Sequence, residues 1–170
     1  AQSDQDTKTL KTTLKDYLKV VKAKDIEAVL DYMPPQMFEA TPRAQIKAAL
    51  SGENMQKVEY KKMDIKKISP IFTHQKIKYV LINYLAVVTI PTPTKDSEQM
   101  EMFLTNMQAA LGKDNVSLDK KKGELSVMSV AQMYAILNPA IKGWKFIGRK
   151  QGTPLPENII PEAVVQHFPE

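Results

Sequence analysis

The longest apolar stretch of the chain, residues 76–90, has the pattern of a central β-strand. Its first residues alternate between lysine and apolar side chains, and from Tyr79 onward both faces are apolar. β-branched and aromatic residues dominate the stretch, and Pro91 and Pro93 mark its end. A strand that is apolar on both faces is covered on both sides of its sheet. We therefore expect this strand to be the spine of a curved sheet.

The segment before the spine strand, residues 57–68, predicts a bent strand. Its apolar positions change parity twice along the chain; they are Val58, Tyr60, Met63, Ile65 and Ile68. One extra residue at a β-bulge restores a common face after each change. We predict bulges near 61–62 and 66–67, a connection at 69–75, and antiparallel pairing with the spine strand.

Helical periodicity marks three segments that precede both strands, at about 6–23, 26–33 and 41–52. Asp25 has the position of an N-cap for the second helix. The proline pair after this helix ends it, and a short helical turn is expected to reach Phe38.

The second half of the chain predicts a helix and then more strands. The expected elements are a helix at 96–111, strands at 115–119, 124–137 and 143–150, and a last helical turn at 161–168. We interpret the whole as one α+β domain, 1–170, in which N-terminal helices pack on a strongly curved, bulged antiparallel sheet, with the helix near 96–111 as an insertion. Residues 1–8 are expected to form a flexible tail and 152–170 a C-terminal extension that packs on the body.

Composition narrows the function classes. The chain has 170 residues, 43% of them apolar, a net charge of +5 and no cysteine. The basic excess is almost all lysine, so nucleic-acid binding, which favours arginine, is not expected. No segment is long and apolar enough for a membrane span. We also expect an exported protein (periplasmic or extracellular) whose leader has been removed, because cysteine is absent and the sequence starts at Ala1 with a polar run.

Two stretches resemble a known family. Residues 24–38 look like the second helix, and the turn after it, of the nuclear-transport-factor-two-like superfamily, whose fold is a cystatin-like α+β cone. Residues 134–136 followed by 143–147 are similar to its closing hairpin. The resemblance covers about 10–150, and the chain resembles secreted bacterial members of unknown function. It implies a cone-shaped cavity between the concave sheet face and the helices.

The leading functional hypothesis is a non-enzymatic protein that binds a small or apolar ligand, or a partner, in this cavity. Aromatic rings with polar groups suit such a pocket. The candidate ligand-binding residues are Phe38, Tyr60, Asn83, Tyr84, Tyr134 and Trp144. Asn83 lies within the apolar spine, so it needs a partner, either backbone groups at a bulge or a ligand. No metal and no cofactor are expected.

Two alternatives remain open. A small isomerase or dehydratase would use Asp64 as general base with Tyr60 or Tyr134, which requires Asp64 to point into the cavity. Lysines at neighbouring positions favour a solvated Asp64 instead. The two histidines, His74 and His167, are expected on the surface. The second alternative is a homodimer that pairs outer sheet faces.

Overall fold

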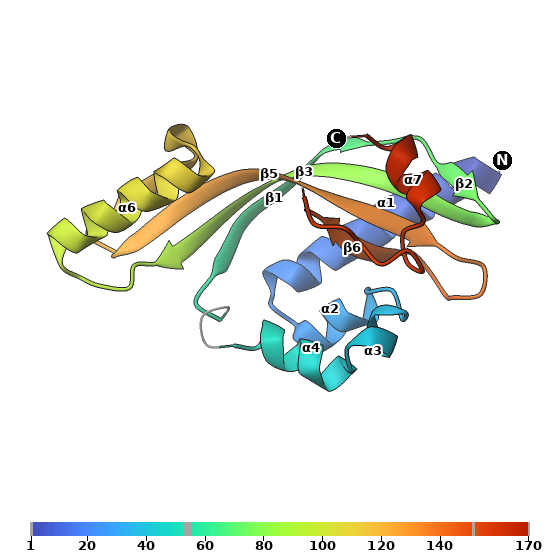
Figure 1. Ribbon diagram of the computed structural model, residues 1–170, viewed down its shortest axis with the longest axis horizontal. Helices are drawn as coiled ribbons and strands as arrows, with labels where there is room; N and C mark the ends of the chain where they lie inside the picture. Colours follow the sequence, from blue (N-terminus) through green and yellow to red (C-terminus); the bar gives the residue numbers. More distant parts are fainter. Residues whose placement is uncertain (1, 53–55, 151, 170) are drawn as a thin grey trace.

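The centre of the structure is an antiparallel sheet (Figure 1). This computed structural model describes residues 2–52, 56–150 and 152–169. The strands of the described part are β1 (Glu59–Ile68), β2 (Phe72–His74), β3 (Ile77–Pro91), β4 (Val116–Asp119), β5 (Glu124–Leu137) and β6 (Lys145–Arg149). Their order is β1-β3-β5-β4, with β2 also on β3 and β6 also on β5.

β3 is the central strand, as its sequence predicts. It pairs with β5 from Lys78 to Pro91 without a register break, and with β1 and then β2 along its other edge. Val80 and Ile82 are fully buried, and Tyr79 is 2% exposed. In this part of β3 the apolar character of both faces is therefore explained by cover on both sides.

The predicted bulges in β1 are confirmed. Its register with β3 shifts between Tyr60 and Lys62 and again between Ile65 and Lys67. Each shift adds one residue to β1, so the apolar positions on both sides of the bulges return to one face of the sheet. In Figure 1 the strands bend along their length.

The helices occupy the positions that periodicity predicts, with one correction at the N-terminus. They are α1 (Gln2–Lys22), α2 (Ile26–Asp31), α3 (Met37–Ala40), α4 (Arg43–Leu50), α6 (Ser97–Leu111) and α7 (Glu162–His167). α1 begins at Gln2, so the prediction of a flexible tail at 1–8 is wrong for the described residues 2–8. Asp6 pairs with Lys78 of β3, which holds this part of the helix against the sheet.

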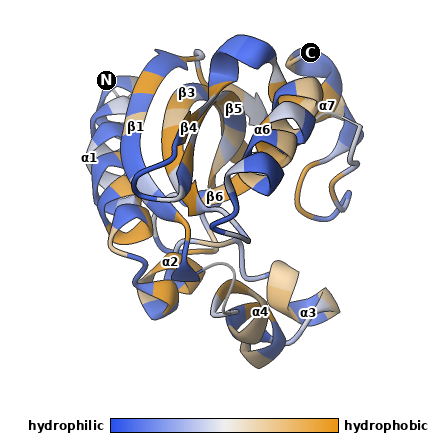
Figure 2. Cartoon of the chain, turned by 90° about the vertical axis from the view of Figure 1, so that its left-hand side faces the viewer, coloured by the Kyte–Doolittle hydropathy of each residue, from blue (hydrophilic) through white to orange (hydrophobic). Residues whose placement is uncertain are grey.

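One face of the sheet, here called the α1 face, is covered by α1 at one end and by α6 at the other. Val80 and Ile82 on this face pack with Leu10, Leu14 and Leu18 of α1. Farther along β3, Val88 and Ile90 have the same parity and belong to the cluster with α6. Figure 2 shows α1 and α6 on opposite sides of the view, because the sheet twists strongly between them.

The opposite face is covered at one end only. Tyr79 and Leu81 of β3 pack there with the C-terminal segment, in which Ile160 and Val164 are buried. Toward the α6 end the same face carries two apolar cross-strand pairs, which we call the uncovered sheet face; the β5 member of each pair is exposed and the β3 member is half-buried. Its residues are Leu85 opposite Val130 and Val87 opposite Met128.

The helices α2 and α4 form a small group below the sheet in Figure 1. The Arg43 guanidinium of α4 lies 3.1 Å from a Glu27 carboxylate oxygen and 2.8 Å from one of Asp31, both on α2. Lys145 of β6 donates a hydrogen bond to the backbone oxygen of Asp31, at 2.6 Å. Polar contacts therefore tie these helices to each other and to β6.

Two local predictions need correction. The connection at 69–75 contains strand β2, whose residues pair with the first residues of β3. The sequence predicts Thr41 as the N-cap of the third helix and Pro42 as its first residue. α4 instead begins at Arg43 with Pro42 at its N-cap, one residue later, and no side chain caps it. The α+β class, with helices packed against a curved antiparallel sheet, is confirmed. Among the described residues, no helix has the length and apolar character to cross a membrane.

Candidate functional site

The predicted ligand-binding residues do not meet in one cavity. Tyr60 and Tyr84 lie on the α1 face, and Trp144 is buried in the core cluster of α1. Asn83 and Tyr134 lie on the opposite face, since Asn83 alternates with Tyr84 along β3 and Tyr134 pairs with Leu81. The sheet itself therefore separates the two sets.

Phe38 lies apart from both sets, on the short helix α3. Its ring is half-buried, and the Arg43 guanidinium lies 5.4 Å from the ring centroid. Phe38 thus contributes to the attachment of α4 through a cation–π contact.

Asn83 has a partner within the protein. Gln132 of β5 lies directly opposite Asn83, and its Nε2 donates a hydrogen bond to Asn83 Oδ1 at 2.8 Å. Neither of the predicted partners, a backbone group at a bulge or a ligand, is needed to explain this amide.

Asp64 and Tyr60 point to opposite sides of the sheet. Asp64 pairs with Leu85 on the face away from α1, and its carboxylate lies 3.1 Å from the amine of Lys62. The Asp64 side chain is 42% exposed. The structure therefore separates Asp64 from Tyr60. Tyr134, the other phenol of the isomerase alternative, lies on the same face as Asp64 but opposite Leu81, four residues along β3 from the Leu85 that pairs with Asp64. Asp64 is partly exposed beside Lys62, so it does not meet the requirement that it point into a cavity.

The space between α1 and the sheet is filled with side chains. Trp144 is 2% exposed, and its indole nitrogen donates to Thr9 Oγ1 at 3.4 Å. The Tyr17 ring stacks on Phe146 with 4.6 Å between centroids. The two candidate cavities lie beside this core.

The larger of two candidate cavities, which we call the helix-side cavity, has a volume of about 520 Å³. It lies between α3, α4, the edge strand β6 and the segment 153–159. Its apolar lining includes Met33, Met37, Ile46, Phe146, Leu155 and Ile159. Lys150 is the one charged residue among the described lining residues, so this cavity offers mainly apolar contact.

Gly148 also lines the helix-side cavity. A Cβ atom built on Gly148 meets no atom within 4 Å, and the backbone there is not left-handed. Gly148 pairs with Met133, whose side chain packs on the α1 face. The missing side chain therefore leaves space at the wall of the cavity.

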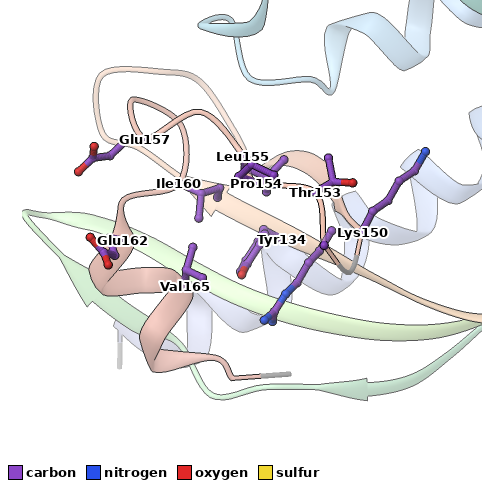
Figure 3. Close-up of a pocket in the computed structure, with 11 residues that line it drawn as sticks. Tyr134, Lys150, Thr153, Pro154, Leu155, Glu157, Ile160, Glu162 and Val165 are labelled. Carbon is purple, nitrogen blue, oxygen red and sulfur yellow. The ribbon is translucent and has the colours of Figure 1, made fainter.

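The second cavity, which we call the C-terminal cavity, has a volume of about 420 Å³. It lies between β5, β6 and the chain from Lys150 to Val165, so the segment around Leu155 borders both cavities. Figure 3 shows Tyr134 at its centre, with Ile160 and Val165 beside the ring. Both volumes fall in the range of about 300–1,000 Å³ that small-molecule sites occupy.

The phenol groups of the tyrosines near these cavities are protonated at neutral pH. Burial, reinforced by Tyr84 and Tyr60, raises the pKa of Tyr17 to about 12. Burial also raises the pKa of Tyr134, against the opposing effect of the Arg149 charge. Each phenol is therefore a hydrogen-bond donor at neutral pH and not a general base.

The rings of His74 and His167 both stack on the ring of Phe72. The Phe72 ring lies 3.8 Å from the His167 ring and 6.4 Å from the His74 ring, in stacked geometry. No group of three or more histidine, aspartate or glutamate side chains within the described part of the chain is placed to hold a metal ion.

Sequence reasoning missed Arg149 and Gly148. Arg149 had one available signal: it is one of two arginines in a chain whose basic residues are otherwise lysine. Gly148 gave no signal, because the space beside it is made by residues far away in the sequence. No family model, curated protein or solved structure matches this chain. The functional assignment therefore rests on the geometry of the cavities.

Proposed function

We propose that this chain is a non-catalytic binding protein that takes a small apolar ligand into the helix-side cavity. The observation that carries the proposal is the combination of a volume near 520 Å³ with an apolar lining. Removal of apolar ligand surface from water supplies about 25 cal/mol per Å², so such a lining favours apolar ligands.

The wall of the helix-side cavity suits ligands of differing shape. Met33 and Met37 contribute flexible thioether side chains, which adjust to irregular surfaces. α3 and α4 contain no fully buried residue, so little packing energy opposes a small displacement of these helices. A ligand can therefore gain contact without disruption of the core beneath α1.

The absence of suitable acid–base groups at the described lining of this cavity supports a non-catalytic role. Its residues include no histidine, aspartate or glutamate, and its one phenol, Tyr17, has a pKa of about 12. General acid–base catalysis needs a group whose pKa lies near the working pH.

Substitutions at Gly148 test the proposal. We expect Gly148→Leu to fill the cavity, because the added side chain enters open space, and Gly148→Ala to leave most of the volume free. The neutral probe N-phenyl-1-naphthylamine should bind the wild-type protein and Gly148→Ala, and bind Gly148→Leu at least roughly tenfold more weakly.

Urea denaturation provides the control for these variants. Gly148→Leu should be as stable as the wild type, since a strand glycine carries an entropic cost that leucine removes. The proposal fails if the probe does not bind the wild-type protein, or binds a folded Gly148→Leu variant equally well. Native mass spectrometry of freshly purified protein adds a second readout, a retained apolar compound.

The proposal includes the family and compartment expected from the sequence. Helices followed by a bulged, curved antiparallel sheet are the order of the nuclear-transport-factor-two-like superfamily, and this order supports membership. Export is supported by the absence of cysteine alone. Fractionation of cells that express the full-length gene tests it, and recovery solely in the cytosol would contradict it.

A second candidate function, self-association, is favoured by the uncovered sheet face. Val130 is 74% exposed and Met128 is 40% exposed, and they lie side by side on β5. Contiguous exposed apolar side chains on a sheet are typical of interaction surfaces. The partner in this hypothesis is a second copy of the chain.

A further inference from the structure

The C-terminal cavity contains two polar groups that lack partners. Tyr134 is 1% exposed, and its hydroxyl is buried with no hydrogen-bond partner. Nη1 of Arg149 is likewise buried and unpaired. An unsatisfied buried donor is rare in native proteins and costs roughly 1–3 kcal/mol, so each of these two calls for an explanation.

The two unsatisfied groups belong to one site. The guanidinium carbon of Arg149 lies 5.5 Å from the centroid of the Tyr134 ring, and both residues line the same cavity. β5 and β6 hold them in place, because Tyr134 pairs with Ile147, two residues before Arg149. Two residues with unpaired donors therefore lie next to each other on paired strands in the cavity wall.

No carboxylate in the described structure neutralises Arg149. Glu157 and Glu162 also line the cavity, but the Glu157 side chain points outward in Figure 3. Oε1 of Glu162 accepts a hydrogen bond from Gln166 within α7 at 3.1 Å. Lys150 extends away from the cavity centre in the same view. The positive charge inside the cavity therefore belongs to Arg149.

The rest of the cavity wall near Tyr134 is apolar. Leu155, Ile160 and Val165 contribute hydrocarbon side chains, and Figure 3 shows Ile160 and Val165 close to the Tyr134 ring. A ligand that fits this lining has an apolar body and one group that accepts hydrogen bonds from both a guanidinium and a phenol.

We propose that the C-terminal cavity is a binding site for a small organic monocarboxylate with an apolar body. Both donor atoms are buried in the free protein, so the two side chains shift toward the cavity on binding. One carboxylate oxygen then accepts from Arg149 Nη1 and the other from the Tyr134 hydroxyl, so the ligand satisfies both unpaired donors. The apolar body packs on the side chains of the C-terminal segment. This site is separate from the helix-side cavity, and the inference does not depend on the proposed function.

Isothermal titration calorimetry with octanoate tests the inference. Octanoate should bind the wild-type protein, and octan-1-ol, which has the same chain without the charge, should bind at least tenfold more weakly. Arg149→Met and Tyr134→Phe should each weaken octanoate binding at least tenfold, because each removes one donor and keeps most of the side-chain volume. Lys142→Gln, at an exposed position that lines neither cavity, is the charge control and should bind octanoate as the wild type does.

Two further measurements keep the test decisive. Tyr134→Phe should have a urea midpoint equal to or above that of the wild type, since the lost hydroxyl makes no hydrogen bond. Gly148→Leu, which fills the other cavity, should leave octanoate affinity unchanged. The inference is overturned if octanoate does not bind, if folded Arg149→Met and Tyr134→Phe bind it with wild-type affinity, or if Gly148→Leu abolishes its binding while Arg149→Met does not.

Discussion

At the residue scale, Asn83 and Gln132 form a hydrogen-bonded pair across β3 and β5. Asn83→Leu leaves the Gln132 amide without its partner, so we expect the free energy of unfolding to fall by about 1 kcal/mol. The double variant Asn83→Leu, Gln132→Leu replaces both amides by apolar groups and should recover most of this loss. Urea denaturation of the wild type, both single variants and the double variant gives the coupling energy.

The comparison with Gln132→Leu is the internal control of this cycle. Gln132→Leu should lower the free energy of unfolding by a similar amount, because it leaves the Asn83 amide without its hydrogen-bond partner. Strictly additive losses in the double variant would show that the 2.8 Å contact contributes no coupling to stability.

The same pair shows the limit of sequence reasoning for single residues. The alternation of β3 placed Asn83 correctly on one face with Leu81 and Leu85, because side chains alternate along any strand. Its partner lies 49 residues away, and the β3–β5 register alone brings the two together. For the same reason the sequence did not indicate that Arg149 and Tyr134 lie together, because their contact depends on the β5–β6 register.

At the element scale, the attachment of α4 to α2 should depend on pH. Hydrogen bonds from Lys47 and then Arg43 lower the pKa of Glu27. A carboxyl group whose pKa is lower in the folded state stabilises the fold above its ordinary pKa of 4.5, and this contribution disappears as the pH falls through the lowered value. We expect Glu27→Gln to lower the urea midpoint slightly at pH 7 and not at low pH, below the lowered pKa.

Glu39→Gln is the matched control for this pH series. Glu39 lies on the neighbouring helix α3, is exposed, and forms no ion pair with a described residue. The difference between Glu27→Gln and Glu39→Gln should be small, because exposed ion pairs are screened by water and salt, and it should shrink as the pH falls. Parallel pH profiles for the two variants would contradict a role for the Glu27 contacts.

Elements were predicted best where local chemistry decides them. The bulges of β1 followed from parity, because an apolar residue on the wrong face must be corrected within the strand. The α6 start also followed, since Asp96 accepts from the Gln99 backbone nitrogen at 3.0 Å. β2 was missed because its three residues become a strand only through β3. The first turns of α1 were missed because they have few apolar side chains.

At the scale of the whole molecule, the α+β order was predictable and the position of the cavities was not. The aromatic residues were assigned to one hollow, but strand register distributes them over both faces of the sheet. The observed cavities are bounded by the C-terminal segment, which the sequence indicates as an extension that packs on the body. Their walls combine distant parts of the chain, and no local pattern contains that information.

The uncovered sheet face makes a prediction about the intact molecule. A second copy packed on this face about a two-fold axis would set the apolar pairs of the two copies together. We expect sedimentation equilibrium to show a mass above the 19.2 kDa of one chain as concentration rises. Val130→Lys should remain at the single-chain mass, because each copy would then place an unpaired ammonium group within the apolar contact. Met102→Lys, at a 63% exposed position on α6, is the control and should associate as the wild type does. If the wild-type protein stays at the single-chain mass at high concentration, self-association through this face is contradicted.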